Sequence, residues 1–161
     1  MPTNLLRKTA AKTAPAARTE AVAGPRLALI TAGRIAIRLK LLETPTADRL
    51  WAALPLYSTA EPWGQSIHFE TPIESGRERG ARLHATRGEI FFWIEEDRIL
   101  IPYGRTPISR PEEIRLPRPC NVWAEALDDV TLLKSVRPGE KIELRKLAEK
   151  AGSTGARVRS R

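Results

Sequence analysis

Few side chains in this sequence could act as acids, bases, nucleophiles or metal ligands. The 161 residues include two histidines, His68 and His84, and one cysteine, Cys120. Ser66 and His68 are two residues apart, which places them on one face of a strand, but a Ser–His–Asp relay needs a convergent geometry that spacing does not supply. We therefore favour a solvated strand face here, and we expect no metal site and no cofactor.

Two loop residues are better candidates for a functional surface than Ser66 and His68. Trp63 lies between a proline and a glycine, at the junction of a loop with an expected strand. Arg105 lies between a glycine and a Thr-Pro pair, outside any expected strand, and its side chain is either functional or simply solvated. We expect Trp93 and Trp123 to pack in the core, and Cys120 to be buried and unreactive.

The elements that must position these residues are organised around residues 88–109. Two apolar runs, residues 90–94 and 99–103, flank an acidic tip at residues 95–98. The runs are rich in β-branched and aromatic residues, so they predict two antiparallel strands joined by a tight turn. They contain four of the nine Phe, Trp and Tyr residues of the chain, and we expect them to form the middle of a sheet. No ligand-spaced partner follows the acidic tip, so we interpret it as a solvated turn and not as a metal loop.

Shorter alternating or apolar runs predict the other strands. They cover residues 27–31, 34–40, 65–70, 121–127 and 141–146. In the fourth of these runs, we expect Val122 and Ala124 on one face, and Asn121 and Trp123 on the other.

Capping residues, prolines and glycines predict the helices and loops. Thr44-Pro45 followed by Asp48 indicates the start of a short helix that Pro55 ends, and residues 128–136 indicate a helical turn with an Asp cap. Residues 107–119 contain four prolines and are expected to be a long extended loop. Residues 74–87 are polar and glycine-containing, and we expect a mobile loop or a ragged sheet edge.

Together these elements predict one mainly β domain at residues 27–150. Seven or eight short strands linked mostly by hairpins favour a small closed or nearly closed antiparallel barrel, because closure removes exposed strand edges. One or two short helices would cap the openings of the barrel. The length suits a single domain.

Basic charge is concentrated at the two ends of the chain. Of the net charge of +8, residues 1–26 carry +4 and residues 151–161 carry +3. We interpret both segments as disordered basic tails, and we expect no nucleic-acid partner beyond non-specific tail contacts. Residues 1–26 lack the apolar core of a secretory signal but share the composition of a transit peptide, so we expect a cytoplasmic protein with that alternative open. No run of about 18 apolar residues exists, so no membrane-spanning segment is expected.

Several motifs, in order along the chain, resemble the cyclophilin family. Residues 33–39 (GRIAIRL) are similar to that family's GRIVIEL strand, residues 45–50 to the start of its first helix, and residues 121–124 to its HTIFG strand. The segments at residues 63–72 and 103–109 are similar more narrowly to small prokaryotic cyclophilin-like proteins of unassigned activity. The resemblance therefore implies a bacterial-type minimal β-barrel with helices at its ends.

The resemblance carries over the family's catalytic residues only in part. Prolyl cis/trans isomerisation in that family depends on an arginine in an FHR motif, and Phe69 stands at the matching position here. The family's pocket Trp falls at Ile108, its pocket His near Cys120, and a small pocket residue near Trp93. The uncatalysed barrier is about 18–20 kcal/mol, and a site without a polarising donor has little means of lowering it.

We therefore expect a module that binds a peptide or protein segment, such as a proline-containing peptide, without efficient isomerase activity. The residues expected to contact the peptide are Trp63, Gln65, Phe69, Phe92, Trp93, Ile108 and Cys120. One alternative is a prolyl isomerase with a rebuilt site, in which Arg105, His68 or Tyr103 polarises the amide. Another is a small-molecule or hydrolytic site in the mouth of the barrel. The sequence does not determine the oligomeric state.

Overall fold

A computed structural model of the chain describes residues 24–147, and the expected tails at residues 1–26 and 151–161 lie almost wholly outside them. The first alternating runs form a hairpin of β1 (Leu27–Ala32) and β2 (Ile35–Leu41). The last strand, β10 (Lys141–Lys146), pairs antiparallel with the other side of β1. Alternate side chains of these strands are buried, so this part of the sheet has one face on the core and one face in water.

The central hairpin forms as predicted. It consists of β7 (Glu89–Trp93), the single turn η1 (Ile94–Glu96) and β8 (Arg98–Pro102). β8 also pairs with β5 (Ser66–Glu70), and β7 pairs with β9, so the hairpin lies in the middle of the sheet.

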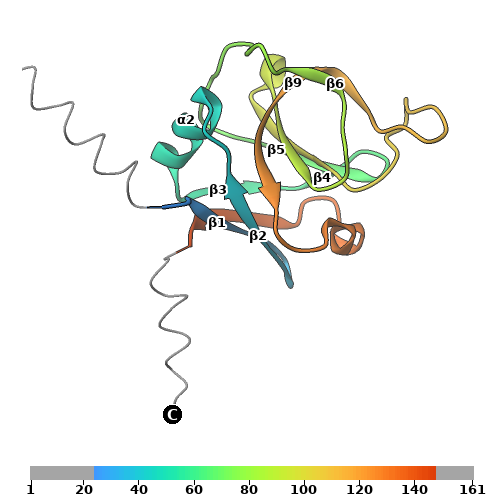
Figure 1. The fold of residues 1–161 in the computed structure, drawn as a ribbon. Coiled ribbons are helices and arrows are strands. Elements are labelled where there is room, and N and C mark those ends of the chain that lie inside the picture. Colours follow the sequence, from blue (N-terminus) through green and yellow to red (C-terminus); the bar gives the residue numbers. More distant parts are fainter. Residues whose placement is uncertain (1–23, 148–161) are drawn as a thin grey trace, which may run out of the picture.

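The sheet of residues 24–147 has ten strands and is a nearly closed barrel (Figure 1). Its strand order is β3-β10-β1-β2-β9-β7-β8-β5-β4, with β6 paired to β9 outside this path. The two end strands, β3 (Leu56–Thr59) and β4 (Glu61–Pro62), are consecutive in the chain and separated by Ala60. The barrel therefore closes through the covalent chain, because β3 pairs with β10 and β4 pairs with β5. The predicted barrel is confirmed, and the additional strands β3, β4 and β6 are short.

The proline-rich segment is a strand for part of its length, so the predicted loop at residues 107–119 was wrong there. β9 (Arg115–Ala126) passes through Pro117 and Pro119. Along this first half, β9 pairs on one side with the edge strand β6 (Arg82–His84), with a register shift. Proline is tolerated where one side of a strand has no partner, because the ladder then needs no N–H there.

The predicted faces of β9 were also wrong. The register between β7 and β9 shifts between Ile90 and Phe91, which is the mark of a bulge. Trp123 and Ala124 consequently both lie in the barrel core, while Val122 packs in a second cluster. Phe91 and Leu100 belong to that second cluster, on the opposite face of β7 and β8 from the core.

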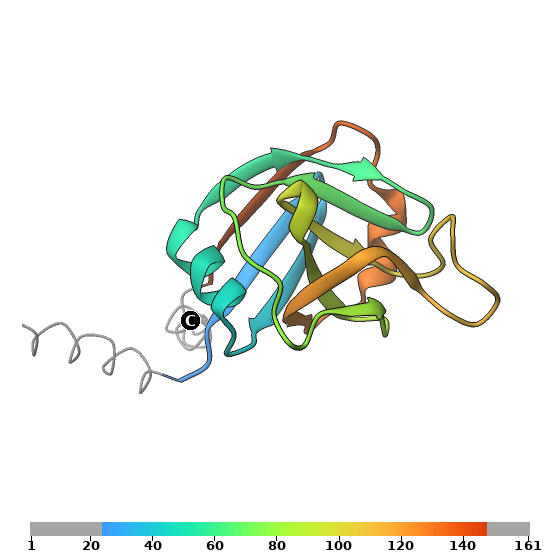
Figure 2. The same ribbon diagram turned by 90° about the horizontal axis from the view of Figure 1, so that it is seen from above.

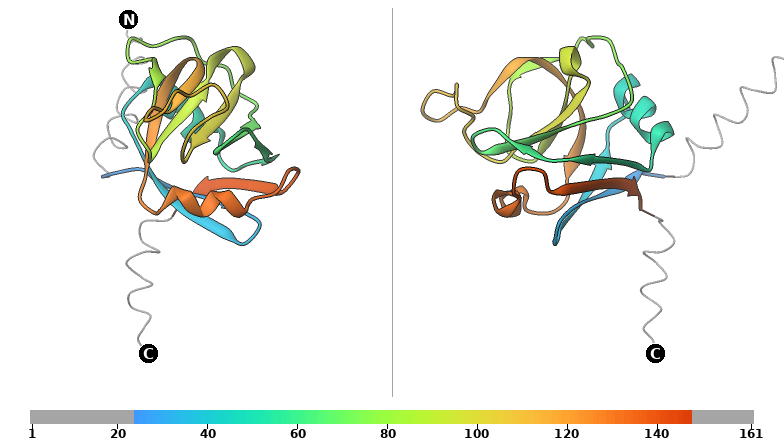
Figure 3. Two further views of the ribbon diagram at one scale, coloured as in Figure 1. Left: turned by 90° about the vertical axis from the view of Figure 1, so that its right-hand side faces the viewer. Right: turned by 180° about the vertical axis from the view of Figure 1, so that it is seen from behind.

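Two short helical elements lie at opposite ends of the barrel (Figures 1 and 2). α2 (Pro45–Ala53) begins where the Thr44 hydroxyl accepts a hydrogen bond from the backbone N–H of Ala47, and it buries Ala47 and Leu50. η2 (Val130–Ser135), which follows β9 in the chain (Figure 3), is capped by Asp129. It buries Val130 and Leu133. Both caps were predicted, because a cap depends on residues that are adjacent in the chain.

The turn before β5 is tightly packed around Gly64. The φ of Gly64 is +61°, and a Cβ there would lie 2.5 Å from Cδ and 3.0 Å from the backbone N of Pro107. Gly33 has nearly the same φ, +60°, but an added Cβ would meet the flexible end of the Glu140 side chain. We expect Gly64→Ala to reduce the free energy of unfolding by about 1–3 kcal/mol more than Gly33→Ala, because backbone atoms cannot give way as a side chain can. Urea unfolding of both variants measures the difference, and equal losses would contradict this packing.

Candidate functional site

The three residues predicted as catalytic do not converge. His68 lies in β5, on the same outer face as Arg98 of β8. Tyr103 follows β8 and packs partly buried against the core, which raises its pKa by desolvation. The Arg105 side chain is exposed and forms no hydrogen bond or ion pair with any residue of the described range.

The surroundings of His68 disfavour its protonated form and lower its pKa. Its Nδ1 lies 3.2 Å from Nη1 of Arg98, and a guanidinium has donors but no acceptor, so Nδ1 accepts and the ring proton belongs on Nε2. The edge of the ring packs against Trp93, with 5.6 Å between ring centroids. Burial lowers the pKa of His68, and the positive charge of Arg98 lowers it further, while Glu61 and Glu96 act in the opposite direction.

Gln65 positions the loop that carries Arg105. Its backbone N–H donates to the Arg105 carbonyl at 2.8 Å, and its side-chain Oε1 accepts from the Arg105 N–H at 2.8 Å. Its carbonyl accepts from the N–H groups of Tyr103 and Gly104. Trp63, next to this clamp, is half-buried, and Ile108 at the other end of the loop is 47% exposed. Gln65 and the loop that carries Arg105 are therefore neighbours in the fold.

Three members of the expected peptide-binding set lie inside the protein. Phe69 and Phe92 have no exposed surface and belong to the barrel core, because they alternate with outward residues along β5 and β7. Cys120 is likewise fully buried, in the second cluster with Phe91 and Leu100. A peptide on the folded surface could not touch these side chains, because they have no exposed area. Trp93 is partly buried and packed against His68.

The sequence did not indicate a large hollow that we call the seam cleft. It has a volume of about 940 Å³ and lies between β3 and the end of β5. Its lining comes from Ala53 and from residues 55–59, 70–72 and 141–142. Tyr57, which lines it, is 70% exposed, the most exposed large apolar side chain of the described range. A run such as Leu-Tyr-Ser-Thr has little alternation, which is why β3 and its cleft escaped prediction.

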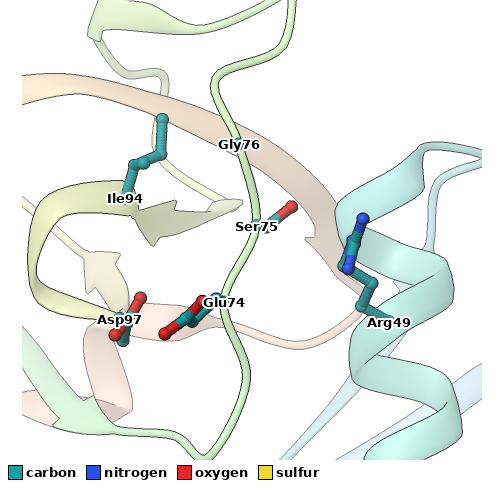
Figure 4. Close-up of a pocket in the computed structure, with 6 residues that line it drawn as sticks. All are labelled: Arg49, Glu74, Ser75, Gly76, Ile94 and Asp97. Atoms are coloured by element: carbon teal, nitrogen blue, oxygen red, sulfur yellow. The ribbon is translucent and has the colours of Figure 1, made fainter.

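A second hollow, which we call the mouth pocket, lies between α2, residues 74–76 and η1 (Figure 4). Its volume is about 430 Å³. The residues that line it are Arg49, Glu74, Ser75, Gly76, Ile94 and Asp97. Figure 4 shows the carboxylates of Glu74 and Asp97 directed toward one another, with Arg49 on the other side of residues 74–76.

A buried polar network fixes the floor of the mouth pocket. The Thr46 hydroxyl donates to Oε2 of Glu78 at 2.6 Å and accepts from Nδ2 of Asn121 at 3.0 Å. Since its single proton goes to Glu78, Ser75 donates the 2.7 Å bond between the two hydroxyls. Nδ2 of Asn121 also donates to the Gly76 carbonyl at 2.8 Å. Thr46 and Asn121 are fully buried, so the network is rigid as well as satisfied.

The described residues were also compared with the requirements of a metal site and of a membrane-spanning helix. Residues 24–147 contain no group of three or more His, Cys, Asp or Glu side chains placed to hold a metal ion. Within the same residues, no helix has the length and apolar character needed to cross a membrane.

Comparison with known proteins agrees with this fold. A family model described as cyclophilin-like matches residues 26–145, and the chain therefore belongs to the cyclophilin-like family. The solution structure of the hypothetical protein AF2241 from Archaeoglobus fulgidus is 28% identical, with a TM-score of 0.66, and the match covers 76% of this chain and 95% of that one. A structure of McbB in complex with tryptophan shares the fold at 14% identity, with a TM-score of 0.57, over 76% of this chain and 45% of that one. No curated protein matches the sequence.

The position of His68 beside Arg98 predicts its titration. We expect an NMR midpoint below the ordinary value of about 6.5, and a rise of that midpoint in Arg98→Met, because the variant removes a neighbouring positive charge. Arg87→Met removes an exposed arginine elsewhere and should leave the midpoint unchanged. Because the unfolded chain takes up the proton first, the contribution of neutral His68 to stability is present above about pH 6.5 and is lost as the pH falls through the folded pKa. A midpoint that Arg98→Met leaves unchanged would refute this account.

Burial of Cys120 predicts an inert thiol. Desolvation, with a smaller contribution from Glu95, raises its pKa to about 12. Its Sγ donates a hydrogen bond to the Arg118 carbonyl at 3.1 Å, which also engages the neutral thiol. At pH 8 we expect iodoacetamide to modify the native chain at least about 100-fold more slowly than the urea-unfolded chain, because the thiolate is the reactive form. The single cysteine makes the assay unambiguous, and Cys120→Ser gives the background. Equal rates would show that Cys120 reaches solvent.

Proposed function

We propose that this cyclophilin-like domain binds an extended peptide segment in the seam cleft and does not efficiently catalyse prolyl isomerisation. The observation that carries the proposal is the free edge of β3. Within residues 24–147, β3 pairs with β10 on one side and with no strand on the other. An unpaired edge beside a cleft can accept a further strand, with main-chain hydrogen bonds providing affinity.

Alternation along β3 identifies which backbone groups face the cleft. The N–H of Ala60 donates to the Glu140 carbonyl, and the Ala60 carbonyl accepts from Gly139, so Ala60 bonds toward β10. Residues along a strand alternate in direction, and Tyr57 and Thr59 therefore direct their N–H and C=O groups away from β10 and toward the cleft.

The opposite wall also has free backbone groups. The Ser66 carbonyl accepts from Trp63 on the β4 side, whereas the N–H of Thr71 donates to Asp97 on the β8 side. By the same alternation, Glu70 points its backbone groups toward the β4 side, where the ladder has ended at Glu61. Two partly unpaired edges thus border one hollow of about 940 Å³, a volume within the usual range for ligand sites.

The residues proposed for catalysis give no support to the isomerase alternative. The donors of Arg98 that approach the outer face are already occupied by His68 at 3.2 Å and by Glu61 and Glu70 at 3.5 Å. Tyr103 packs against the core, and Arg105 lies on the loop after β8, whereas His68 lies in β5. A preorganised donor aimed at the prolyl amide is what lowers such a barrier, and these side chains do not share a site where one would act.

The test uses the full chain labelled with ¹⁵N and a panel of Xaa-Pro hexapeptides blocked at both ends. We expect peptide binding to shift the amide signals of Tyr57, Thr59 and Glu70, while exchange spectra show the slow uncatalysed isomerisation of the peptide, which takes tens of seconds or longer. Tyr57→Ala should weaken binding by about 5-fold or more, because an aromatic anchor of this kind contributes on the order of 1 kcal/mol.

A matched pair of variants isolates the main-chain contact. Thr59→Pro removes the N–H that faces the cleft, and Thr59→Ala removes the side chain but keeps the N–H. We expect Thr59→Pro to bind more weakly than Thr59→Ala, since one backbone hydrogen bond contributes about 0.5–1.5 kcal/mol. Clear acceleration of isomerisation would establish the enzyme alternative, and binding that shifts signals at Trp63, Arg105 and Ile108 instead would place the peptide at the loop.

A further inference from the structure

We propose that the mouth pocket binds a free α-amino acid, with the ligand carboxylate on Arg49 and its ammonium group between Glu74 and Asp97. The site shares no lining residue with the seam cleft, so it is independent of the peptide-binding function.

The charges around the mouth pocket are left without partners of their own. Within residues 24–147, the side chains of Arg49, Glu74 and Asp97 form no ion pair and no hydrogen bond, although charges of both signs line one hollow. Asp48, adjacent to Arg49 on α2, is by contrast paired with Arg26 at 3.0 Å. A pocket that presents a cation and two carboxylates to solvent is complementary to a zwitterion, because each end of the ligand finds the opposite charge.

The cation and the two carboxylates reach the pocket from different elements. In Figure 4, Glu74 and Asp97 approach one another from two elements, so an ammonium group between them would contact both carboxylates. Arg49 projects from α2 on the far side of residues 74–76. A guanidinium can hold a carboxylate by two parallel N–H bonds, which fixes the orientation of the bound molecule.

Much of the pocket is already ordered, which lowers the cost of binding. Ser75 and Gly76 are held by the network around Thr46 and Asn121. Asp97 has a left-handed backbone with φ of 55°, and its carbonyl accepts from both the N–H and the hydroxyl of Thr71, at 3.0 and 2.9 Å. A residue fixed in this conformation presents its side chain in a defined direction.

The neutral part of the lining indicates the class of amino acid. Ile94 is the one aliphatic side chain on the wall, and it packs against the barrel core. A volume of about 430 Å³ admits a small molecule and not a folded segment. An amino acid with an aliphatic side chain, such as leucine, satisfies both the charges and this apolar surface.

Three probes test the assignment on the ¹⁵N-labelled full chain. L-leucine carries both charges, N-acetyl-L-leucine lacks the ammonium group, and L-leucinamide lacks the carboxylate. We expect L-leucine to shift the amide signals of Ser75, Gly76 and Asp97 in a saturable manner, with at least 10-fold weaker binding of either analogue. If L-leucinamide binds as well as L-leucine, the pocket is a simple amine site. If N-acetyl-L-leucine binds as well, it is a carboxylate site, and if L-leucine gives no saturable shift, the pocket binds no amino acid. Each of these outcomes overturns the proposal.

Variants of single charges complete the test. Arg49→Gln and Asp97→Asn should each weaken L-leucine binding by 10-fold or more, and asparagine retains the capacity for the left-handed conformation at residue 97. Arg77→Gln removes an exposed arginine next to the pocket that does not line it, and it should bind L-leucine as the unmodified chain does. A loss in Arg77→Gln equal to that in Arg49→Gln would show that only the general charge of this region matters. Unchanged shifts of the Tyr57 amide throughout would keep the two sites distinct.

Discussion

Closure of the barrel through one residue is the constraint on which the remaining structure depends. Ala60 bonds to the turn before β10, and on either side of it the chain pairs with different neighbours, β10 for β3 and β5 for β4. A sheet built from hairpins would otherwise end in two exposed edges, which favour association with other chains. Here the edges meet at Ala60 but separate beyond it, and the gap that they leave is the seam cleft.

The buried hydroxyl of Thr46 has a comparable role at one end of the barrel. It joins the first turn of α2 to Ser75, Glu78 and Asn121, so helix, loop and β9 are fixed to one another by a single polar network. Buried polar groups cost free energy unless they are fully paired, and a paired set specifies one arrangement. The position of residues 74–76, and hence the shape of the mouth pocket, follows from this arrangement.

The outer face of the central strands shows how side chains on a shared fold can be used within the protein itself. On that face β7 and β8 carry a second apolar cluster that includes Phe91, Leu100 and Cys120. His68 and Arg98, beside this cluster, bind each other. His68 and Arg98 on this face are thus paired within the protein, although the buried Nε1 of Trp93 has no hydrogen-bond partner within residues 24–147. The hollows with unpaired backbone or charged groups lie at the seam and at the mouth. Family membership fixes the scaffold, and the sites on it have to be argued residue by residue.

What the sequence determined by itself was local or periodic. The β7–β8 hairpin, the alternation of β2 and the caps at Thr44 and at the start of η2 depend on residues within a few positions of one another, and all were predicted. The motif resemblance to cyclophilins also gave the family and the barrel. Tertiary structure decided which partner each strand has. The first half of β9 has a partner strand on one side only, and it can therefore contain two prolines. A bulge in its second half places Trp123 and Ala124 together in the core. The inward direction of Phe69, the free edge of β3 and the placement of Arg49 and Asp97 around one hollow likewise depend on residues far apart in the chain, which no local pattern records.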